Sequence, residues 1–264
     1  MATSFNNKKS IDLISKNQAF HIINKFHYSN VLPRITKYYF GLYEDKILVG
    51  TITLGWGVRP KHTIKKLFPL LDSKDYLEIG KMCLNDDMPR NSETQFLSLI
   101  VSWLKNNLPE LIYLFTWADG IMGKAGYVYQ AFNMKYGGYI WTDCYVSDKG
   151  EKIHPRTIQG IIGSNSKNLK YGSRPNDEQR KKLKLSRLKG KQFRYILPLN
   201  KKGKKMLKLS LVDWFQKYPK EKDLEWKLKK CNSNDYQYTN IIPINFRKVN
   251  DFNKLNINLQ PTLL

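Results

Sequence analysis

The chain has 264 residues and a formal net charge of +23, from 45 Lys and Arg against 22 Asp and Glu. This length allows one large domain, or one domain with a long extension. An apolar content of 41% with 13% aromatic residues excludes a disordered or collagen-like chain. The longest apolar run, at residues 97–104, is far shorter than the roughly 20 residues of a membrane span.

Two further features indicate the compartment. The N-terminal sequence lacks the apolar region of a signal peptide. The three cysteines, Cys83, Cys144 and Cys231, are widely spaced, which excludes a disulfide framework or a four-cysteine zinc site and suits a reducing environment. We therefore expect a soluble, strongly basic globular protein in the cytoplasm.

The positive charge is concentrated in the second half of the chain. Residues 1–150 carry a net charge of +5, whereas residues 151–264 carry +18. The codon usage of an AT-rich genome explains Lys in place of Arg, but it does not explain why acidic residues are scarce in the second half. A large positive excess favours a nucleic acid as partner, because counterions released from phosphates drive binding. A ribosomal, membrane-surface or merely solvated basic surface is the alternative.

The first part of the chain begins with helical and then strand patterns. A helix is expected over Lys16–Phe26, with its apolar residues on one side. Two β-branched and aromatic runs follow, Tyr38–Tyr43 and Lys46–Trp56, and the Glu44-Asp45 pair between them predicts a hairpin turn. Tyr76–Leu84 is expected to be another strand.

The next elements complete the alternation of helix and strand. Ser92 to Gln95 has the spacing of a capping box, which predicts the start of a helix that Pro109 ends. Leu111–Trp117 is expected to be a buried strand, a short helix follows Gly123, and Tyr136–Val146 is a last strand or hairpin. This order predicts a mixed α/β sheet with helices on its faces.

The second half is predicted to be a basic, largely helical elaboration of this core. Its predicted elements are a helix over Asp177–Leu188 capped near Asn176, a strand over Gln192–Leu199 and a helix over Lys204–Lys217. We predict a catalytic core at residues 1–150, a basic extension packed on it at 151–230 that binds DNA, and an Asn-rich tail at 231–264.

Several residues could carry chemistry. Asp119 directly follows the strand Leu111–Trp117, and ligands bind at the carboxyl ends of strands in open α/β sheets. Its carboxylate could hold or deprotonate an exocyclic amine, or it could simply cap the turn. Tyr129 and Gln130 lie on the next helix, off its apolar stripe. A tyrosine there can donate a proton to a leaving group or stack on a base, although packing is the commoner role. His27 ends the first helix, where a histidine often only balances the dipole.

A second candidate site lies at a loop-to-helix junction. Arg90, Asn91 and Ser92 combine free backbone N–H groups, a helix dipole and a positive side chain, which suits a phosphate or pyrophosphate. The alternative is an ordinary capped helix. The order of elements is that of GNAT-type acyltransferases, whose pyrophosphate loop lies at this junction, but their Gly-rich run is missing here.

Many short motifs in one order resemble the Mom family of phage DNA-modification proteins, GNAT-like enzymes that alter adenine in duplex DNA. The matching segments are Phe26–Ser29, Leu32-Pro33, Phe40–Tyr43, Val49-Gly50, Leu54–Gly57, Leu84, Asn91–Thr94, Ala118-Asp119, Gly123, Gly126, Tyr129–Ala131, Trp141–Asp143, His154–Thr157, Lys191, Arg194-Tyr195, Pro198-Leu199 and Tyr218–Lys220. The likeness covers roughly residues 20–220. No single motif is decisive, but their number and order are.

The resemblance implies a reaction and a set of catalytic residues. These are Tyr28, Asp119 and Tyr129, with His27 beside them and Lys81 where the family has an arginine. Lysine keeps the charge but loses the planar fork. The implied reaction attaches a methylcarbamoyl (acetamido) group to adenine N6 and protects phage DNA from restriction in the host cytoplasm. An acyl-CoA-type donor is one option, and the types of His21, His27, Glu78 and Asp119 would also suit iron, although their spacing does not require it.

A base in a duplex must be flipped out before it can react. The resemblance therefore implies aromatic walls near Asp119, for which the candidates are Trp56, Trp117, Tyr127 and Tyr129. It also implies contacts to double-stranded DNA from the basic half, with Arg156, Arg174, Arg180, Lys191 and Arg194 as candidates. Two alternatives stay open: an N-acyltransferase acting on an amine of RNA, protein or a small molecule, and a nucleic-acid-binding protein without activity. The oligomeric state is also open, with a dimer among the options.

Overall fold

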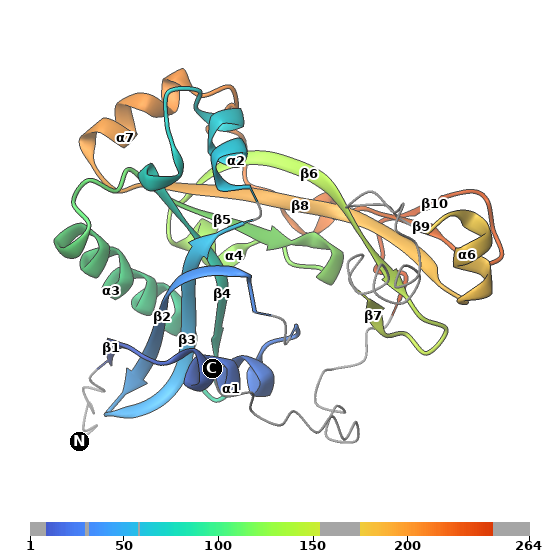
Figure 1. The fold of residues 1–264 in the computed structure, drawn as a ribbon, viewed down its shortest axis with the longest axis horizontal. Coiled ribbons are helices and arrows are strands. Elements are labelled where there is room, and N and C mark those ends of the chain that lie inside the picture. Colours follow the sequence, from blue (N-terminus) through green and yellow to red (C-terminus); the bar gives the residue numbers. More distant parts are fainter. Residues whose placement is uncertain (1–8, 30–31, 58, 154–174, 245–264) are drawn as a thin grey trace, which may run out of the picture.

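A computed structural model of the chain describes residues 9–29, 32–57, 59–153 and 175–244 (Figure 1). Within these ranges, ten strands form one sheet in the order β1-β2-β3-β4-β5-β8-β6-β7, with β9 paired to β8 and β10 to β9. Helices lie on both faces of the sheet, so the predicted mixed α/β fold is confirmed. No helix in these ranges is long and apolar enough to cross a membrane.

The elements follow one another along the chain with short connections. The first are β1 (Lys9–Leu13), α1 (Lys16–Phe26), β2 (Ile35–Glu44), β3 (Ile47–Trp56), α2 (Pro60–Leu67) and β4 (Tyr76–Leu84). The next are α3 (Ser92–Asn107), β5 (Tyr113–Asp119), α4 (Tyr127–Ala131), β6 (Lys135–Val146) and β7 (Lys152–Ile153). The last are α6 (Asp177–Lys182), β8 (Ser186–Pro198), α7 (Lys201–Met206), β9 (Trp226–Lys229) and β10 (Gln237–Thr239). α1 and β4 have the bounds that the sequence predicted.

Two local predictions need correction. The β2–β3 hairpin turns at Asp45 and Lys46, not at Glu44 and Asp45, and both turn residues have positive φ angles of 48° and 66°, as a type I′ turn requires. α3 begins at Ser92 as expected, but the predicted capping box does not form. Asn91 is the N-cap in a left-handed conformation and makes no side-chain hydrogen bond to the helix.

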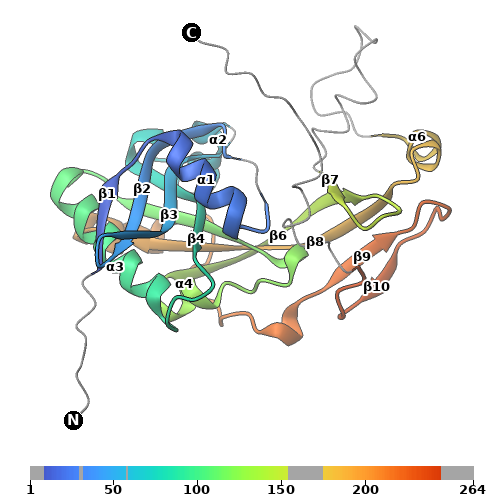
Figure 2. The ribbon, with the colours of Figure 1, turned by 90° about the horizontal axis from the view of Figure 1, so that it is seen from below.

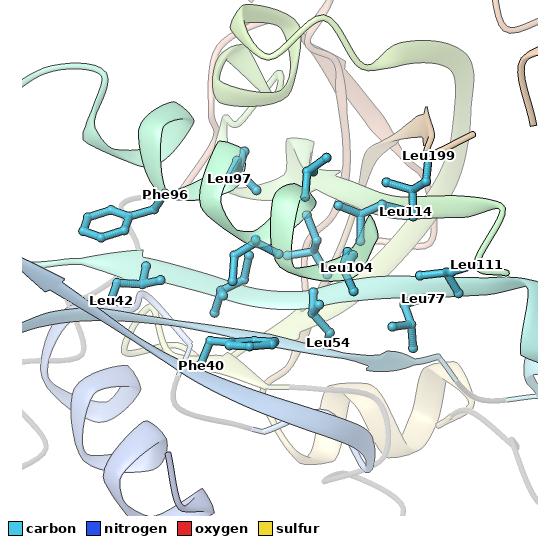
Figure 3. Close-up of a cluster of buried hydrophobic side chains, with 14 of the residues drawn as sticks. Phe40, Leu42, Leu54, Leu77, Phe96, Leu97, Leu104, Leu111, Leu114 and Leu199 are labelled. Atoms are coloured by element: carbon cyan, nitrogen blue, oxygen red, sulfur yellow. The ribbon is translucent and has the colours of Figure 1, made fainter. Parts of the chain in front are cut away.

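The two faces of the sheet carry different helices, α1 and α2 on one side and α3 and α4 on the other (Figure 2). α3 buries Phe96 and Leu104 against Phe40 of β2 and its neighbours (Figure 3). On the opposite face, Ile64 of α2 packs with Phe115 of β5. Burial of each such side chain stabilises the fold by about 1.5–3 kcal/mol. The face that carries α1 and α2 is called the α1/α2 face below.

β4 and β5 are parallel neighbours that separate before either strand ends. Their last paired residues are Ile79 and Thr116. β4 then shifts its register against β3 at Gly80 and runs on to Leu84, while β5 runs on to Asp119. The two strands diverge beyond this point (Figure 1). Their carboxyl ends therefore point in different directions, and each offers backbone groups that the other strand does not pair.

β8 lies inside the sheet, between β5 and β6, and pairs with β5 from Tyr113 to Asp119. Residues of the basic half therefore belong to the same sheet as the core. The division at residue 150 remains a prediction, but it does not coincide with an edge of this sheet.

The helices predicted in the second half are wrong in extent. The helix expected over Asp177–Leu188 ends at Lys182, although Asn176 does cap it, and β8 begins at Ser186. Leu188 fits a helical or a strand period, and its pairing with β6 and β9 favours the strand. The helix expected over Lys204–Lys217 is shorter, because α7 ends at Met206 and is followed by the single 3₁₀ turn Leu207–Leu209.

Arg180, a predicted DNA contact, is instead a structural residue. Its side chain is buried, with 1% relative exposure. The guanidinium donates to the carbonyl oxygens of Leu185, Lys230 and Ser233 at 3.2, 2.5 and 2.6 Å, and Nε donates to Asp177 at 3.3 Å. These bonds hold α6 against the end of β9. The guanidinium is therefore unavailable to a phosphate.

Replacing Arg180 with Met should lower the free energy of unfolding by about 2–4 kcal/mol, because three buried carbonyl groups lose a charged donor. Chemical denaturation measures this change. The exposed Lys182→Met variant on the same helix is the control and should unfold like wild type. A folded Arg180→Met protein with wild-type stability but weakened DNA binding would contradict the structural role.

Candidate functional site

Asp119 is the last residue of β5, and its two carboxylate oxygens have different partners. Oδ1 accepts the backbone N–H of Ile121 at 3.1 Å and so caps the 3₁₀ turn Gly120–Met122. Oδ2 accepts from Nζ of Lys152 at 2.9 Å and lies 3.4 Å from the donating hydroxyl of Tyr28. Both roles that the sequence left open are therefore compatible, because one oxygen caps the turn while the other faces polar side chains.

Tyr28 lies between Asp119 and several cationic or aromatic groups. Its ring stacks on His27 with centroids 4.3 Å apart. The ammonium groups of Lys81 and Lys152 lie 5.7 and 5.6 Å from the ring centroid. Withdrawal of the hydroxyl from water, and then the charge of Asp119, raise the pKa of Tyr28 above its usual value. The hydroxyl therefore stays protonated and can act as a donor.

Lys81 and His27 form the second side of the site. Nζ of Lys81 donates to the carbonyl of Ser29 at 3.1 Å and lies 3.5 Å from Nδ1 of His27. Burial lowers the pKa of Lys81 to about 8. Burial, followed by the charge of Lys81, lowers the pKa of His27 to about 3. At neutral pH the histidine is therefore neutral, and the lysine is mostly charged and sits close to its titration range.

Tyr129 approaches the same site from α4, on the other side of the diverging strands. Burial raises its pKa, and the hydroxyl shares a hydrogen bond with Thr116. It is close enough to contribute to the raised pKa of Tyr28. Gln130 was predicted to lie off the apolar stripe, which is wrong, because its side chain is buried and donates to the Tyr195 hydroxyl and the Pro219 carbonyl at 3.0 and 2.9 Å.

The structure thus brings together all five predicted catalytic residues, which are His27, Tyr28, Lys81, Asp119 and Tyr129. Sequence reasoning missed Lys152, which makes the shortest polar contact to Asp119. Lys152 comes from a two-residue strand that pairs with β6 at Val146. The only local signal is the turn that ends at Gly150 and returns the chain toward β6.

The predicted anion site lies at the N-terminus of α3. Of Arg90, Asn91 and Ser92, only Arg90 carries a charge, and three acidic residues, Asp86, Asp87 and Glu93, lie within four residues of it in the chain. The N–H of Ser92 already donates to a loop carbonyl at 3.2 Å. The buried Ser92 hydroxyl has no partner among the described residues. An excess of acidic residues does not fit a pyrophosphate.

The structure does not support an iron site. In the described parts of the chain, no three His, Cys, Asp or Glu side chains are grouped closely enough to hold a metal ion. His21 lies exposed on α1. Glu78 lies beside the Gly57 backbone on the α1/α2 face, and burial raises its pKa to about 7. Its titration is therefore linked to the stability of the fold.

The other predicted DNA contacts have mixed positions. Arg156 and Arg174 lie outside the described residues. Lys191 is paired with Glu225 at 3.1 Å and donates to the Asp223 carbonyl at 3.0 Å. The guanidinium of Arg194 lies over the ring of Trp117, 5.8 Å from its centroid.

Of the predicted aromatic walls, Trp117 lies on the same face of β5 as Asp119, two residues before it. Tyr129 of α4 lies on the other side of the site, near Tyr28. The indole N–H of Trp56 donates to the Ser73 and Tyr76 carbonyls at 2.9 and 2.8 Å, so this side chain is structural. Tyr127 is exposed on α4, and its hydroxyl accepts the Glu221 N–H at 3.1 Å. Trp117 is therefore the predicted wall that lies nearest the carboxylate along β5.

Burial of Glu78 predicts a pH dependence. Its pKa rises from 4.5 to about 7 on folding, so its contribution to stability is present below pH 4.5 and is lost as pH rises to 7. His27 acts in the opposite direction between pH 3 and 6.5, because its pKa is lowered.

Between pH 5 and 8, the change in unfolding free energy should differ between wild type and Glu78→Gln by about 2–3 kcal/mol. Chemical denaturation measures it, with exposed Glu110→Gln as the control, and identical pH profiles would contradict the assignment.

Comparison with known proteins confirms the resemblance. The model of the Mom protein family matches residues 8–220. The methylcarbamoylase mom of Escherichia phage Mu is 31% identical over 210 residues, which cover 80% of this chain and 83% of that protein. The ribosomal-protein-S18-alanine N-acetyltransferase from Escherichia coli is 10% identical with a TM-score of 0.40, over 73% of this chain and 95% of its own. An N-acetyltransferase from Staphylococcus aureus Mu50 is 14% identical with a TM-score of 0.39, over 73% and 99%. Both TM-scores lie below 0.5. The match to the family model and the 31% identity to the Mu protein show that the chain belongs to the Mom family.

Proposed function

We propose that this chain is a transferase that attaches a methylcarbamoyl group to N6 of adenine in duplex DNA, in the cytoplasm of a phage-infected cell. The modified DNA would then resist host restriction enzymes. The observation that carries the proposal is the Asp119 carboxylate, whose Oδ2 faces Tyr28 and Lys152 at the carboxyl end of β5. The family membership adds that the Mu relative is a methylcarbamoylase.

The chemistry of the acceptor explains why a carboxylate is needed. The lone pair of the adenine amine is delocalised into the ring, so the nitrogen attacks only if a proton leaves as the new bond forms. Asp119 takes this proton from N6 while N6 bonds to the carbon of the transferred group. Lys152 balances the charge of the carboxylate, and the Tyr28 hydroxyl fixes the orientation of Oδ2.

The leaving group of the donor must also be protonated as it departs. As the bond between the donor and the transferred carbon breaks, the leaving group departs with the electron pair and takes a proton from Tyr129, whose burial keeps the hydroxyl protonated. The charged Lys81 would stabilise negative charge that develops beside Tyr28. What these residues require of the donor is a leaving group that can accept a proton.

Asp119→Asn should remove the base while keeping the size of the side chain. Modified adenosine in the DNA of expressing cells should fall at least about 100-fold, as expected for loss of general-base catalysis. Mass analysis of the hydrolysed nucleosides measures it. Asp148→Asn, at an exposed position in the turn after β6, is the control and should modify DNA like wild type.

Tyr28→Phe separates orientation from packing, because it keeps the ring and removes only the hydroxyl. Modification should fall by about 10-fold, as for loss of one hydrogen bond to a charged group. If Asp119→Asn kept full modification with normal protein levels, the proposed role of the carboxylate would be wrong.

The duplex must lie on the face of the sheet from which Asp119 projects, because a flipped nucleotide stays attached to its strand. On this α1/α2 face, α2 exposes Lys61, Lys65 and Lys66. A second set of lysines, including Lys189 and Lys227, projects from the opposite face and lies over aromatic rings there. We therefore place the contacts to the phosphates that flank the flipped nucleotide on α2.

A pair of matched variants tests this placement. Lys61→Ala with Lys65→Ala should lower the slope of log affinity against log salt by about 2, since each lost phosphate contact removes about 0.9. Lys189→Ala with Lys227→Ala carries the same charge change and should leave the slope unchanged. Fluorescence anisotropy with a labelled duplex measures both. The reverse result would place the duplex on the opposite face.

A further inference from the structure

Four side chains form a small grid beside the carboxylate. Trp117 and Asp119 of β5 pair directly with Arg194 and Gln192 of β8. Residues two apart in a strand share a face, and directly paired residues on neighbouring strands have Cβ atoms about 4.5–5.5 Å apart. Gln192 is therefore the side chain that lies next to Asp119 across the strands, on the same face of the sheet.

Two members of this grid lack hydrogen-bond partners. In the described parts of the chain, the Gln192 amide makes no hydrogen bond, and Nε of Arg194 is buried without an acceptor. The neighbouring polar groups differ. Nε2 of Gln130 lies within hydrogen-bond distance of three oxygens, and Lys152 and Lys191 are paired with carboxylates. Burial of an unpaired polar group such as Arg194 Nε costs about 1–3 kcal/mol, whereas the amide of the half-buried Gln192 is accessible from solution. The grid is therefore left ready for an outside partner.

The chemistry of the two groups indicates which partner. A glutamine amide offers one acceptor and two donors, which match the N6 amine and the N7 acceptor of adenine. The adenine amine has two hydrogens, one for the glutamine carbonyl oxygen and one for the neighbouring carboxylate. Guanine would place its O6 acceptor against two oxygens, and cytosine has no N7. Burial also lowers the pKa of Arg194, which is consistent with a guanidinium that lacks a counterion.

We propose that Gln192 selects adenine by binding its N7 and N6 edge while Asp119 holds the second N6 hydrogen. This inference rests on the proposed function and identifies Gln192 as the residue that recognises the acceptor base. Arg194 is a positioning residue, which binds the phosphate of the same nucleotide from beside Trp117. Trp117 supplies an aromatic face against which the extruded base lies.

The test uses binding, so that it does not need the group donor. Two duplexes each carry one base opposite an abasic site, adenine in the first and 7-deazaadenine, which lacks N7, in the second. The unpaired base is cheap to extrude. Wild type should bind adenine roughly 5-fold to 150-fold more tightly than 7-deazaadenine, the range of one bidentate contact. Gln192→Ala should bind both duplexes equally, and fluorescence anisotropy measures the four affinities.

Matched variants exclude a merely structural effect. Gln192→Glu keeps the size and an acceptor but cannot donate to N7, so it should also lose discrimination. Gln237→Ala, exposed on β10, should keep it. Arg194→Lys should weaken binding to both duplexes by the same factor, because a phosphate contact carries no base information.

Three outcomes separate the inference from the function on which it rests. Equal wild-type affinity for the two duplexes, in a protein that does modify adenine in cells, overturns the role of Gln192 and leaves the function intact. Discrimination that survives in Gln192→Ala does the same. A third outcome is discrimination that depends on Gln192 in a protein that leaves cellular adenine unmodified. This outcome supports recognition of adenine by Gln192 and contradicts the methylcarbamoyl transfer.

Discussion

The early end of the β4–β5 pairing is the constraint on which the site depends. If the two parallel strands stayed paired in the register of Ile79 and Thr116, Lys81 would lie beside Ala118 and project to the opposite face from Asp119, and no space would separate the two strands. Because pairing stops at Ile79 and Thr116, the strands diverge, so that Tyr28, which follows α1, reaches the Asp119 carboxylate and Tyr129 of α4 lies near Tyr28. β8 keeps β5 rigid, since it pairs with β5 along its whole length and so fixes Asp119 from the other edge.

Charge within the site follows from this geometry. One carboxylate faces two ammonium groups, and the histidine between them stays neutral because burial and Lys81 both oppose its protonation. Lys81 responds to the same conditions, and its pKa falls to about 8 because burial and Lys152 outweigh the attraction of Asp119. The site thus combines a base with a net positive surrounding. That combination suits the removal of a proton from an amine and the departure of a negatively charged leaving group.

Most of the elements before residue 147 could be predicted from periodicity and turn residues, and Asp119 from its place at a strand end. The failures at Lys152, Arg180 and Gln130 share one cause, which is that contacts with residues distant in the sequence decide them. Lys152 reaches Asp119 through a two-residue strand that has no pattern of its own. Arg180 has the composition of a surface cation, but the carbonyl groups that bury it come from residues 185, 230 and 233. Gln130 faces the core because Pro219 and Tyr195 lie there.

β8 carries lysines on one face and the proposed base-binding residues on the other. This arrangement changes how the net charge of the chain should be interpreted. Lys189 and Lys191 project from one face of this strand, and Gln192 and Arg194 from the other, because side chains alternate. On the face of the sheet opposite Asp119, Lys191 and Lys229 already have carboxylate partners. If the duplex lies on the face of Asp119, as proposed, the lysines of the opposite face do not contact the phosphates beside the flipped base. They still contribute to the long-range field that attracts a polyanion. A high net charge in one half of a chain therefore favours a nucleic-acid partner without locating where that partner binds.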